Sequence, residues 1–278
     1  MGLVQSYFSA RKELAKQLSR FLPELEAAAE SWRWFEDGLG WDKARLHAHG
    51  EEPITESIEA QLGEWLDRRR SGEPMAYILG WVVWRGRRFR VTPATLIPRP
   101  ETEIVLESAL HLAKRLGSTY TVDVGTGSGI LGISLALEAN MQVTATDISA
   151  EAIEVAKHNA SALGAQIEFA CGDLLKPVDG PIDLVVSNPP YVDFADAPSL
   201  QRELAFEPRS ALFSPGAGMD VAARLLKQCL ERGAKGAVIE IGSGQGAKMK
   251  SQALEVGWKS IEIKQDMAKH DRVLIALA

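Results

Sequence analysis

From about residue 95 onward, the sequence alternates short apolar runs with segments of helical periodicity. The apolar runs are the predicted strands 119–124, 142–147, 166–170, 182–187, 236–241, 258–264 and 272–277. The predicted helices cover 101–116, 129–139, 149–163, 218–232 and 245–256. Strands that alternate with helices form a mostly parallel sheet covered on both faces, so the pattern predicts an α/β fold.

The last two predicted strands follow one another with no helix between them. So short a connection joins antiparallel strands, and the final strand is therefore expected to enter the sheet antiparallel. This ending departs from the all-parallel dinucleotide-binding sheet. It resembles the class I methyltransferase sheet, which is Rossmann-like, seven-stranded and mostly parallel with an antiparallel last strand.

Residues 3 to about 79 show helical periodicity only. Apolar residues recur at helical spacing from Leu14 to Leu22, and Pro23 opens a second predicted helix that runs through Trp34. Further helices are predicted over 41–49 and 55–70, and two strand-like runs around a glycine turn predict a hairpin over 81–91. The expected organisation is a small all-α bundle domain over 1–79, a β-hairpin linker over 80–94 and the α/β domain over 95–278.

Composition narrows the class of protein. The chain has 278 residues, 46% of them hydrophobic, which is enough to fill a core. It has no uninterrupted apolar span of membrane length, and residues 1–20 lack the order of a secretory signal, so a cytoplasmic location is expected. Neither Cys171 nor Cys229 has a second Cys or His at metal-ligand spacing, so no metal site is predicted.

The net charge of −6 disfavours a protein that binds long nucleic acid by neutralising phosphates. A local basic cluster nevertheless follows the helical region, at Arg85, Arg87, Arg88 and Arg90, with 68–70 upstream. It is interpreted either as a solvated hairpin and helix end or as a patch for an acidic partner, such as RNA or a ribosome-associated factor. A small helical domain in front of a catalytic one often recognises a partner.

A glycine-rich turn joins the first strand of the α/β region to a helix. Its residues are Asp123, Val124, Gly125, Thr126, Gly127, Ser128 and Gly129. Such a turn lets backbone approach a nucleotide-like cofactor at a helix N-terminus. The spacing also satisfies G-x-G-x-x-G, with Asp147 twenty residues after Gly127, as a nicotinamide dinucleotide site requires. Two features favour S-adenosylmethionine: the acidic Asp123 within the strand, able to receive an ammonium group, and glycines that begin directly at the strand end.

Further polar residues follow the next strands. Asp147 is expected to accept the ribose hydroxyls, Asp173 to take the adenine amino group and Leu174 to pack against the ring. Without the glycine loop, an exposed turn residue would be the preferred interpretation of Asp173. In a doubly wound sheet, however, the carboxyl ends of neighbouring strands meet at one crevice, and Gly125, Asp147, Asp173 and Asn188 all follow such ends.

The tetrapeptide Asn188-Pro189-Pro190-Tyr191 ends the strand 182–187. It suits a weakly nucleophilic planar nitrogen, whose N–H bonds need acceptors that hold the lone pair toward an electrophile. The Asn188 side-chain oxygen and the Pro189 carbonyl are the predicted acceptors, and Tyr191 offers a flat face for the planar group. The alternative is a strand that ends in a Pro-rich turn. The tetrapeptide does not distinguish an amide from an exocyclic amine.

Together with the glycine loop and the tetrapeptide, the segment 89–103 (FRVTPATLIPRPETE) resembles the HemK/PrmC family of protein-(glutamine-N5) methyltransferases. The resemblance spans the whole chain. It implies methyl transfer from S-adenosylmethionine to the glutamine of the Gly-Gly-Gln motif in class 1 peptide chain release factors. It also implies that 125–129 and Asp147 contact the cofactor, that Asn188 contacts cofactor and substrate, and that 188–191 hold the amide. Glu203, Glu207, Pro208 and 211–212 match a family segment that shapes the pocket.

Two loops depart from the family pattern. Ser214-Pro215-Gly216-Ala217-Gly218 replaces Gly-Gly-x-Asp-Gly, and Lys269 stands where a Gly is usual, so Lys269 must avoid a positive φ or adopt it at some cost. Rival functions are methylation of a ribosomal-protein glutamine and DNA adenine-N6 methylation, which shares the tetrapeptide. From other classes, a nicotinamide oxidoreductase and a non-catalytic cofactor-binding adaptor stay open.

Overall fold

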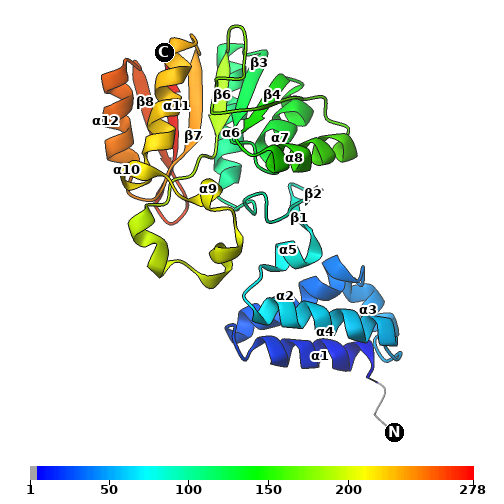
Figure 1. Cartoon of the computed structure of the whole chain (residues 1–278). Helices are drawn as coiled ribbons and strands as arrows, with labels where there is room; N and C mark the ends of the chain where they lie inside the picture. The colour runs from blue at the N-terminus through cyan, green and yellow to red at the C-terminus, as the bar shows by residue number, and fades with distance from the viewer. Residues whose placement is uncertain (1–4) are drawn as a thin grey trace. The chain divides into compact units, whose positions relative to one another are not determined.

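The computed structural model describes residues 5–278, and the first four residues of the predicted helical domain lie outside this range. The chain divides into two compact units, one that ends at Leu79 and one that runs from Gly80 to Ala278 (Figure 1). No helix within residues 5–278 is long and apolar enough to cross a membrane.

The first unit is a small helical bundle. Its helices are α1 (Tyr7–Leu18), α2 (Glu24–Arg33), α3 (Lys43–His49), α4 (Glu56–Arg70) and α5 (Met75–Leu79), with one π-helical turn at Trp34–Gly38. Polar residues cap three of them, because the side chains of Ser6, Asp42 and Thr55 accept from backbone N–H groups in the first turn. Trp34 and Trp65 pack edge to face in its core, with ring centroids 5.7 Å apart. The tryptophans of this unit therefore belong to its hydrophobic core or pack against it.

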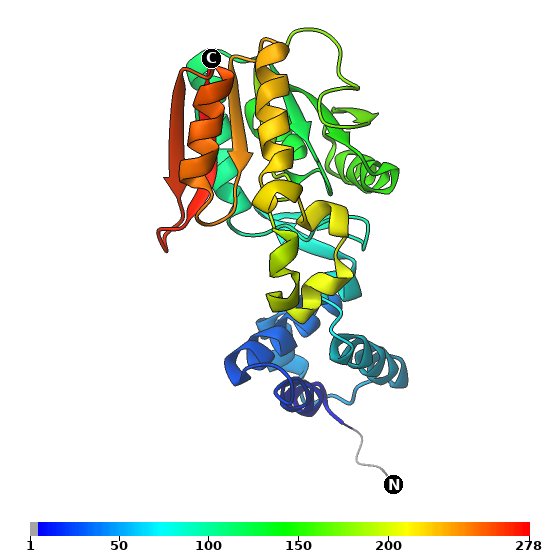
Figure 2. The ribbon, with the colours of Figure 1, turned by 60° about the vertical axis from the view of Figure 1, so that its left-hand side comes forward.

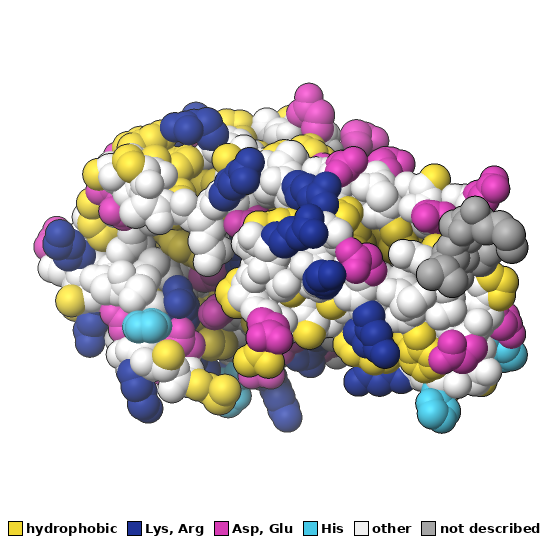
Figure 3. All heavy atoms as spheres, turned by 90° about the horizontal axis from the view of Figure 1, so that it is seen from below, with side chains coloured by type: hydrophobic (Ala, Val, Ile, Leu, Met, Phe, Trp, Pro, Cys, Tyr) yellow, Lys and Arg dark blue, Asp and Glu magenta, His cyan; other side chains and the backbone are white. Residues whose placement is uncertain are grey.

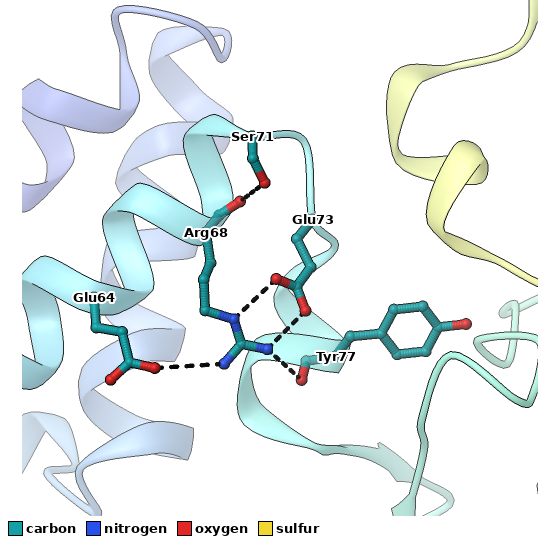
Figure 4. A network of polar contacts seen from close by, with 5 residues as sticks. All are labelled: Glu64, Arg68, Ser71, Glu73 and Tyr77. Carbon is teal, nitrogen blue, oxygen red and sulfur yellow. Dashed lines mark hydrogen bonds and ion pairs between the residues drawn. The ribbon is translucent and has the colours of Figure 1, made fainter.

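Arg68 ties the end of α4 to α5 (Figure 4). Its Nε and Nη2 donate to the two carboxylate oxygens of Glu73, at 2.9 and 2.6 Å, and Nη2 also donates to the Tyr77 carbonyl. Such a bidentate contact fixes the direction of the turn between the helices. Part of the basic run 68–70 thus has a structural role.

The second unit begins with the predicted hairpin, formed by β1 (Trp81–Trp84) and β2 (Arg87–Arg90) in antiparallel register. Arg85 and Arg87 both contact Glu138 of α7 (Ile130–Ala139), at 3.1 and 2.8 Å. Arg88 instead lies over the Trp81 ring, 4.0 Å from its centroid. The charge of the hairpin is therefore partly neutralised within its own unit, and Arg88 and Arg90 stay exposed.

The main sheet has the strand order β5-β4-β3-β6-β7-β9-β8. Its strands are β3 (Tyr120–Val124), β4 (Gln142–Asp147), β5 (Glu168–Cys171), β6 (Leu184–Ser187), β7 (Gly236–Glu240), β8 (Ser260–Gln265) and β9 (Asp271–Leu277). β3 to β7 are parallel, and β9 is antiparallel to both neighbours. This arrangement confirms the predicted class I methyltransferase fold, including the antiparallel last strand.

Helices cover both faces of the sheet. On one face, α11 (Asp220–Glu231) and α12 (Gly246–Val256) lie side by side and pack against alternate residues such as Val122, Val185 and Ile239 (Figure 2). The residues between these, such as Leu184 and Val238, face α6 (Thr102–Leu116), α7 and α8 (Ala150–Leu163). The central strands are buried on both faces, which explains their continuous apolar sequence.

The connection from β6 to β7 holds short elements that helical periodicity does not predict. They are two 3₁₀ turns, Phe194–Ser199 and Arg202–Phe206, followed by α9 (Arg209–Leu212) and α10 (Pro215–Gly218). Within α10, Gly216 and Ala217 have positive φ values of 62° and 56°. Lys269, which replaces the usual Gly, likewise adopts a positive φ of 66°. Of the two expected outcomes, the chain therefore takes the strained backbone conformation.

The start of α7 gives a test of packing. Gly129 has φ 86°, and a Cβ there would meet Ile133 Cδ1 at 2.8 Å and Ala156 Cβ at 3.2 Å. Gly117, at the end of α6, has φ 62° but open space around it. We expect Gly129→Ala to lower the free energy of unfolding by about 2–4 kcal/mol, because backbone strain and overpacking add. The control Gly117→Ala, which adds strain alone, should cost about 1 kcal/mol. Equal losses of unfolding free energy in the two variants, measured by chemical denaturation, would contradict the close packing around Gly129.

Candidate active site

The carboxyl ends of four adjacent strands, β5, β4, β3 and β6, border one cavity of about 310 Å³. Most of the predicted site residues line it: Gly125, Thr126, Gly127, Ser128, Asp147, Asp173, Leu174, Asn188, Pro189 and Pro190. Asp123, Gly129 and Tyr191 are not among the lining residues. The sheet thus brings together residues that are up to 65 positions apart in sequence, from Gly125 to Pro190.

The glycine loop turns sharply as it leaves β3. Gly125 and Gly127 have φ values of 69° and 55°, and a Cβ at either would meet no protein atom within 4 Å. The backbone N–H groups of Gly125 and Thr126 donate to the Thr146 carbonyl, at 2.8 and 2.9 Å. These two bonds tie the loop to β4. The space above the two glycines is open, so a ligand can approach the backbone there.

Asp147, the last residue of β4, braces the loop. Its Oδ2 accepts from Gly127 N at 2.9 Å and its Oδ1 accepts from Ser149 N at 2.9 Å. Burial raises the pKa of the carboxyl, against the effect of these bonds. Each oxygen keeps acceptor capacity for a hydroxyl. Ile148, which the sequence did not single out, lines the cavity beside it and is exposed.

Asp123 lies buried beneath the loop. Its Oδ2 accepts from Thr126 Oγ1 at 2.6 Å and from Gly132 N at 2.9 Å. Its Oδ1 is buried with no hydrogen-bond partner in the described part of the chain. Burial raises the pKa of Asp123 to about 6. A carboxylate in this state is stabilised by any cation that binds nearby.

Asp173, which follows β5, also lines the cavity. Its carboxylate contacts Arg224 of α11 at 2.6 Å and Lys176 at 2.8 Å, and these cations hold its pKa below the usual range. Arg224 also lines the cavity, a role that the sequence did not indicate. Leu174 is buried and adopts φ 53°. The Asp173 carboxylate is therefore already paired with cations, unlike that of Asp123.

Asn188 follows β6 directly and lines the cavity. Its Nδ2 donates to Thr102 Oγ1 at 3.1 Å, while its Oδ1 is buried and has no partner within residues 5–278. The preceding Ser187 is buried and donates through Oγ to the Val124 carbonyl at 2.7 Å, which fixes the end of β6 against β3. The side-chain amide thus carries one anchored end and one unused acceptor.

Tyr191, unlike the two prolines before it, does not line the cavity. Its backbone carbonyl accepts from Gln245 Nε2 at 2.9 Å. Its phenol is largely buried near Glu240 and Arg272, and burial raises its pKa above the usual range. Asn188 also contacts Thr102, which lines the cavity and is joined to the buried Glu240 by a 2.8 Å hydrogen bond. The sequence assigned neither Thr102 nor Glu240 a role in the site. They are 138 residues apart, so no local pattern could reveal the contact.

Glu207 fastens the segment before α6 to the wall of the cavity. Its side chain is 1% exposed, and it accepts from the Ile97 backbone N–H at 3.0 Å and from the Arg99 guanidinium. Pro98 and Pro208, beside these partners, both line the cavity. The contact joins two segments, more than 100 residues apart in sequence, into one wall of the cavity.

Removing the carboxylate should loosen this wall. We expect Glu207→Ala to lower the free energy of unfolding by about 3 kcal/mol, because it leaves a buried N–H and a half-buried guanidinium without their acceptor. Glu231→Ala is the matched control, since its contact with Lys227 is exposed and 3.8 Å long, and it should cost less than about 0.5 kcal/mol. Denaturant titration measures the free energy of unfolding of both variants. Equal losses in the two variants would contradict a stabilising contact between Glu207 and the segment before α6.

The residues present fit a nucleotide-like cofactor that carries a positive charge. The open space above Gly125 and Gly127 admits a ligand close to the backbone, and the unpartnered Oδ1 of Asp123 places a negative charge beneath it. Asp147 supplies acceptors for hydroxyl groups at the next strand end. Within residues 5–278, no group of three or more acidic, His or Cys side chains is placed to hold a metal ion.

Comparisons with known proteins identify the fold and the family. Residues 102–217 match the family described as methyltransferase small domain, and residues 13–80 match the PrmC N-terminal domain. Among solved structures, the catalytic domain of hMettl16 in complex with a MAT2A 3′UTR hairpin has a TM-score of 0.58 at 14% identity, covering 93% of this chain and 92% of that chain. A methyltransferase from Pyrococcus furiosus has a TM-score of 0.53 at 16% identity, over 80% and 98%. Both share the fold.

The curated relatives are more similar in sequence. The release factor glutamine methyltransferase of Koribacter versatilis is 38% identical over 99% of this chain and 98% of its own length. The protein of the same name from Bordetella pertussis is 38% identical over 91% and 94%. The chain therefore belongs to the release factor glutamine methyltransferase family.

Proposed function

We propose that the protein transfers a methyl group from S-adenosylmethionine to the side-chain amide nitrogen, N5, of the glutamine in the Gly-Gly-Gln motif of class 1 peptide chain release factors. The observation that carries the proposal is the amide of Asn188, which lines the cavity with an unused buried acceptor, Oδ1. An amide N–H of a substrate is the donor that this acceptor lacks. The curated relatives support the choice of substrate by their names.

The residues of the chain would bind and orient the reactants. S-adenosylmethionine, when bound, supplies an electrophilic methyl group on a sulfonium centre. Asp147 would hold the ribose hydroxyls, Asp173 and Leu174 the adenine, and Asp123 would favour the ammonium group from beneath the loop. Asn188 Oδ1 and the Pro189 carbonyl would each accept one N–H of the glutamine amide, which turns the nitrogen lone pair toward the methyl group. The extra proton then leaves the nitrogen to solvent, so the scheme needs no general base.

We assign partner recognition to the helical unit and to the exposed face of the hairpin, with Arg88 and Arg90. Figure 3 shows Lys and Arg side chains interspersed with Asp and Glu on the face that it presents. Together with the net charge of −6, this mixture supports a protein substrate over duplex DNA. A release factor substrate is also in keeping with a cytoplasmic enzyme that works near the ribosome.

The deciding experiment offers several substrates at once. The protein is incubated with labelled S-adenosylmethionine and a purified release factor, a ribosomal protein or DNA, and the methyl group is located by mass spectrometry. We expect the label on the glutamine of the Gly-Gly-Gln motif and none on a release factor with Gln→Ala there. Label on the ribosomal protein or on DNA, with none on the release factor, would overturn the proposal.

The charge of Asp123 gives a pH test. Because a cofactor ammonium stabilises the ionised carboxyl, binding should lower its pKa below the value of about 6 in the free protein. The affinity for S-adenosylhomocysteine should therefore weaken about 3- to 10-fold as pH falls from 7 to 5. In Asp123→Asn the affinity should be weaker at pH 7 and should lose most of its dependence on pH between 7 and 5. Calorimetry provides the measurement, with the exposed Asp179→Asn as control, and a pH dependence that survives in Asp123→Asn would exclude this role.

Asn188→Ala separates chemistry from cofactor binding. Loss of the oriented acceptor should reduce the rate of methyl transfer about 100- to 1000-fold, by analogy with the loss of one oriented donor in other active sites. The affinity for S-adenosylhomocysteine should change less than about 3-fold, since the loop and Asp147 still hold the cofactor. Single-turnover rates and calorimetry give the two values, and comparable losses in both would count against the acceptor role.

A further inference from the structure

Glu240 is a buried acid that has no role in the methyl transfer proposed above. It ends β7, is 1% exposed, and accepts through Oε2 from Thr102 Oγ1 at 2.8 Å. Thr102 begins α6, is also 1% exposed, and accepts in turn from Asn188 Nδ2 at 3.1 Å. Three side chains from three separate elements therefore form one hydrogen-bonded chain that ends at the cavity.

The direction of this chain follows from the number of protons. A threonine hydroxyl has one proton, and an ionised carboxylate can only accept, so Thr102 must donate to Glu240. Thr102 then has only lone pairs left for Asn188, which must offer its NH₂ group. The carbonyl end of the Asn188 amide is thereby turned away from Thr102, as its unpartnered Oδ1 is.

We infer that Glu240 and Thr102 are positioning residues that fix the Asn188 amide with its oxygen available to the substrate. The inference rests on the proposed function for what the oxygen binds, but the orientation itself is a property of this chain. With a neutral partner at 240, the Thr102 hydroxyl is free to donate to Asn188 Oδ1 instead. The amide would then rotate and present its NH₂ group, which cannot accept an amide N–H.

Ionisation of Glu240 should therefore control the orientation. Burial raises the pKa of Glu240 to about 7, while Thr102, Tyr191 and Arg272 lower it and Glu101 raises it. Arg272 of β9 also contacts Asp266 at 2.9 Å, and Arg99 lies near Tyr191. Since the ionised form holds the productive amide, the productive population rises as pH rises through about 7.

A measurement without substrate tests the orientation. The side-chain ¹⁵N resonance of Asn188, identified by its loss in Asn188→Ala, should shift with pH with a midpoint near 7. The midpoint should vanish in Glu240→Gln, which cannot titrate, and persist in the exposed control Glu231→Gln. A resonance that does not respond near pH 7 in the wild type, or that titrates equally in Glu240→Gln, would overturn the inference whatever the substrate is.

Kinetics with saturating S-adenosylmethionine test the consequence. Thr102→Val, which keeps the shape without the hydroxyl, should lower kcat about 10- to 100-fold, as misplacement of a reacting group does. The KM for S-adenosylmethionine should stay within about 3-fold, and Thr102→Ser should restore kcat to within about 3-fold of wild type. Circular dichroism confirms that each variant is folded.

The outcomes separate this inference from the proposed function. A wild type that methylates no glutamine refutes the function, while the resonance of Asn188 still decides the orientation. A wild type that methylates glutamine, with Thr102→Val as active as Thr102→Ser, refutes the positioning role alone. Equal losses of kcat and cofactor affinity in Thr102→Val would likewise assign Thr102 a structural role only.

Discussion

The hydrogen bond from Asn188 to Thr102 is the contact on which the site depends. It joins the end of β6 to the start of α6, and through Glu240 it also reaches the end of β7. An asparagine amide has two chemically different ends of nearly the same shape, so packing alone does not choose between them. The buried chain of donors and acceptors makes that choice, and it thereby decides whether the cavity presents an acceptor to an amide substrate.

The sheet places these groups, but contacts outside the sheet give the cavity its walls. Parallel pairing of β5, β4, β3 and β6 brings four strand ends together, and the glycine loop leaves space above them. Glu207 then closes one wall by holding the segment at Ile97 and Arg99 from more than 100 residues away. Burial of the Asp123 and Glu240 carboxyl groups costs free energy and raises their pKa values. Acids perturbed in this way are concentrated at functional sites.

The sequence predicted the parts of the molecule that depend on local periodicity. The strands from β3 to β9, their helices, the hairpin and the antiparallel last strand follow from apolar spacing and connection length. The residues at the strand ends follow from topology, since Gly125, Asp147 and Asn188 each come directly after or at the end of a buried strand. By contrast, Arg224, Ile148, Thr102 and Glu240 reach the site through tertiary contacts that no spacing encodes. Tyr191 illustrates the same limit, because its partners Glu240 and Arg272 lie on distant strands.

The central claim is that the oxygen of Asn188 receives a glutamine amide while its nitrogen stays on Thr102. A crystal structure of the protein with S-adenosylhomocysteine and a peptide that contains Gly-Gly-Gln tests it most directly. We expect the amide nitrogen of the peptide within hydrogen-bond distance of Asn188 Oδ1, with Asn188 Nδ2 still bonded to Thr102 Oγ1. A glutamine bound away from Asn188, or an Asn188 amide whose oxygen contacts Thr102, would contradict it.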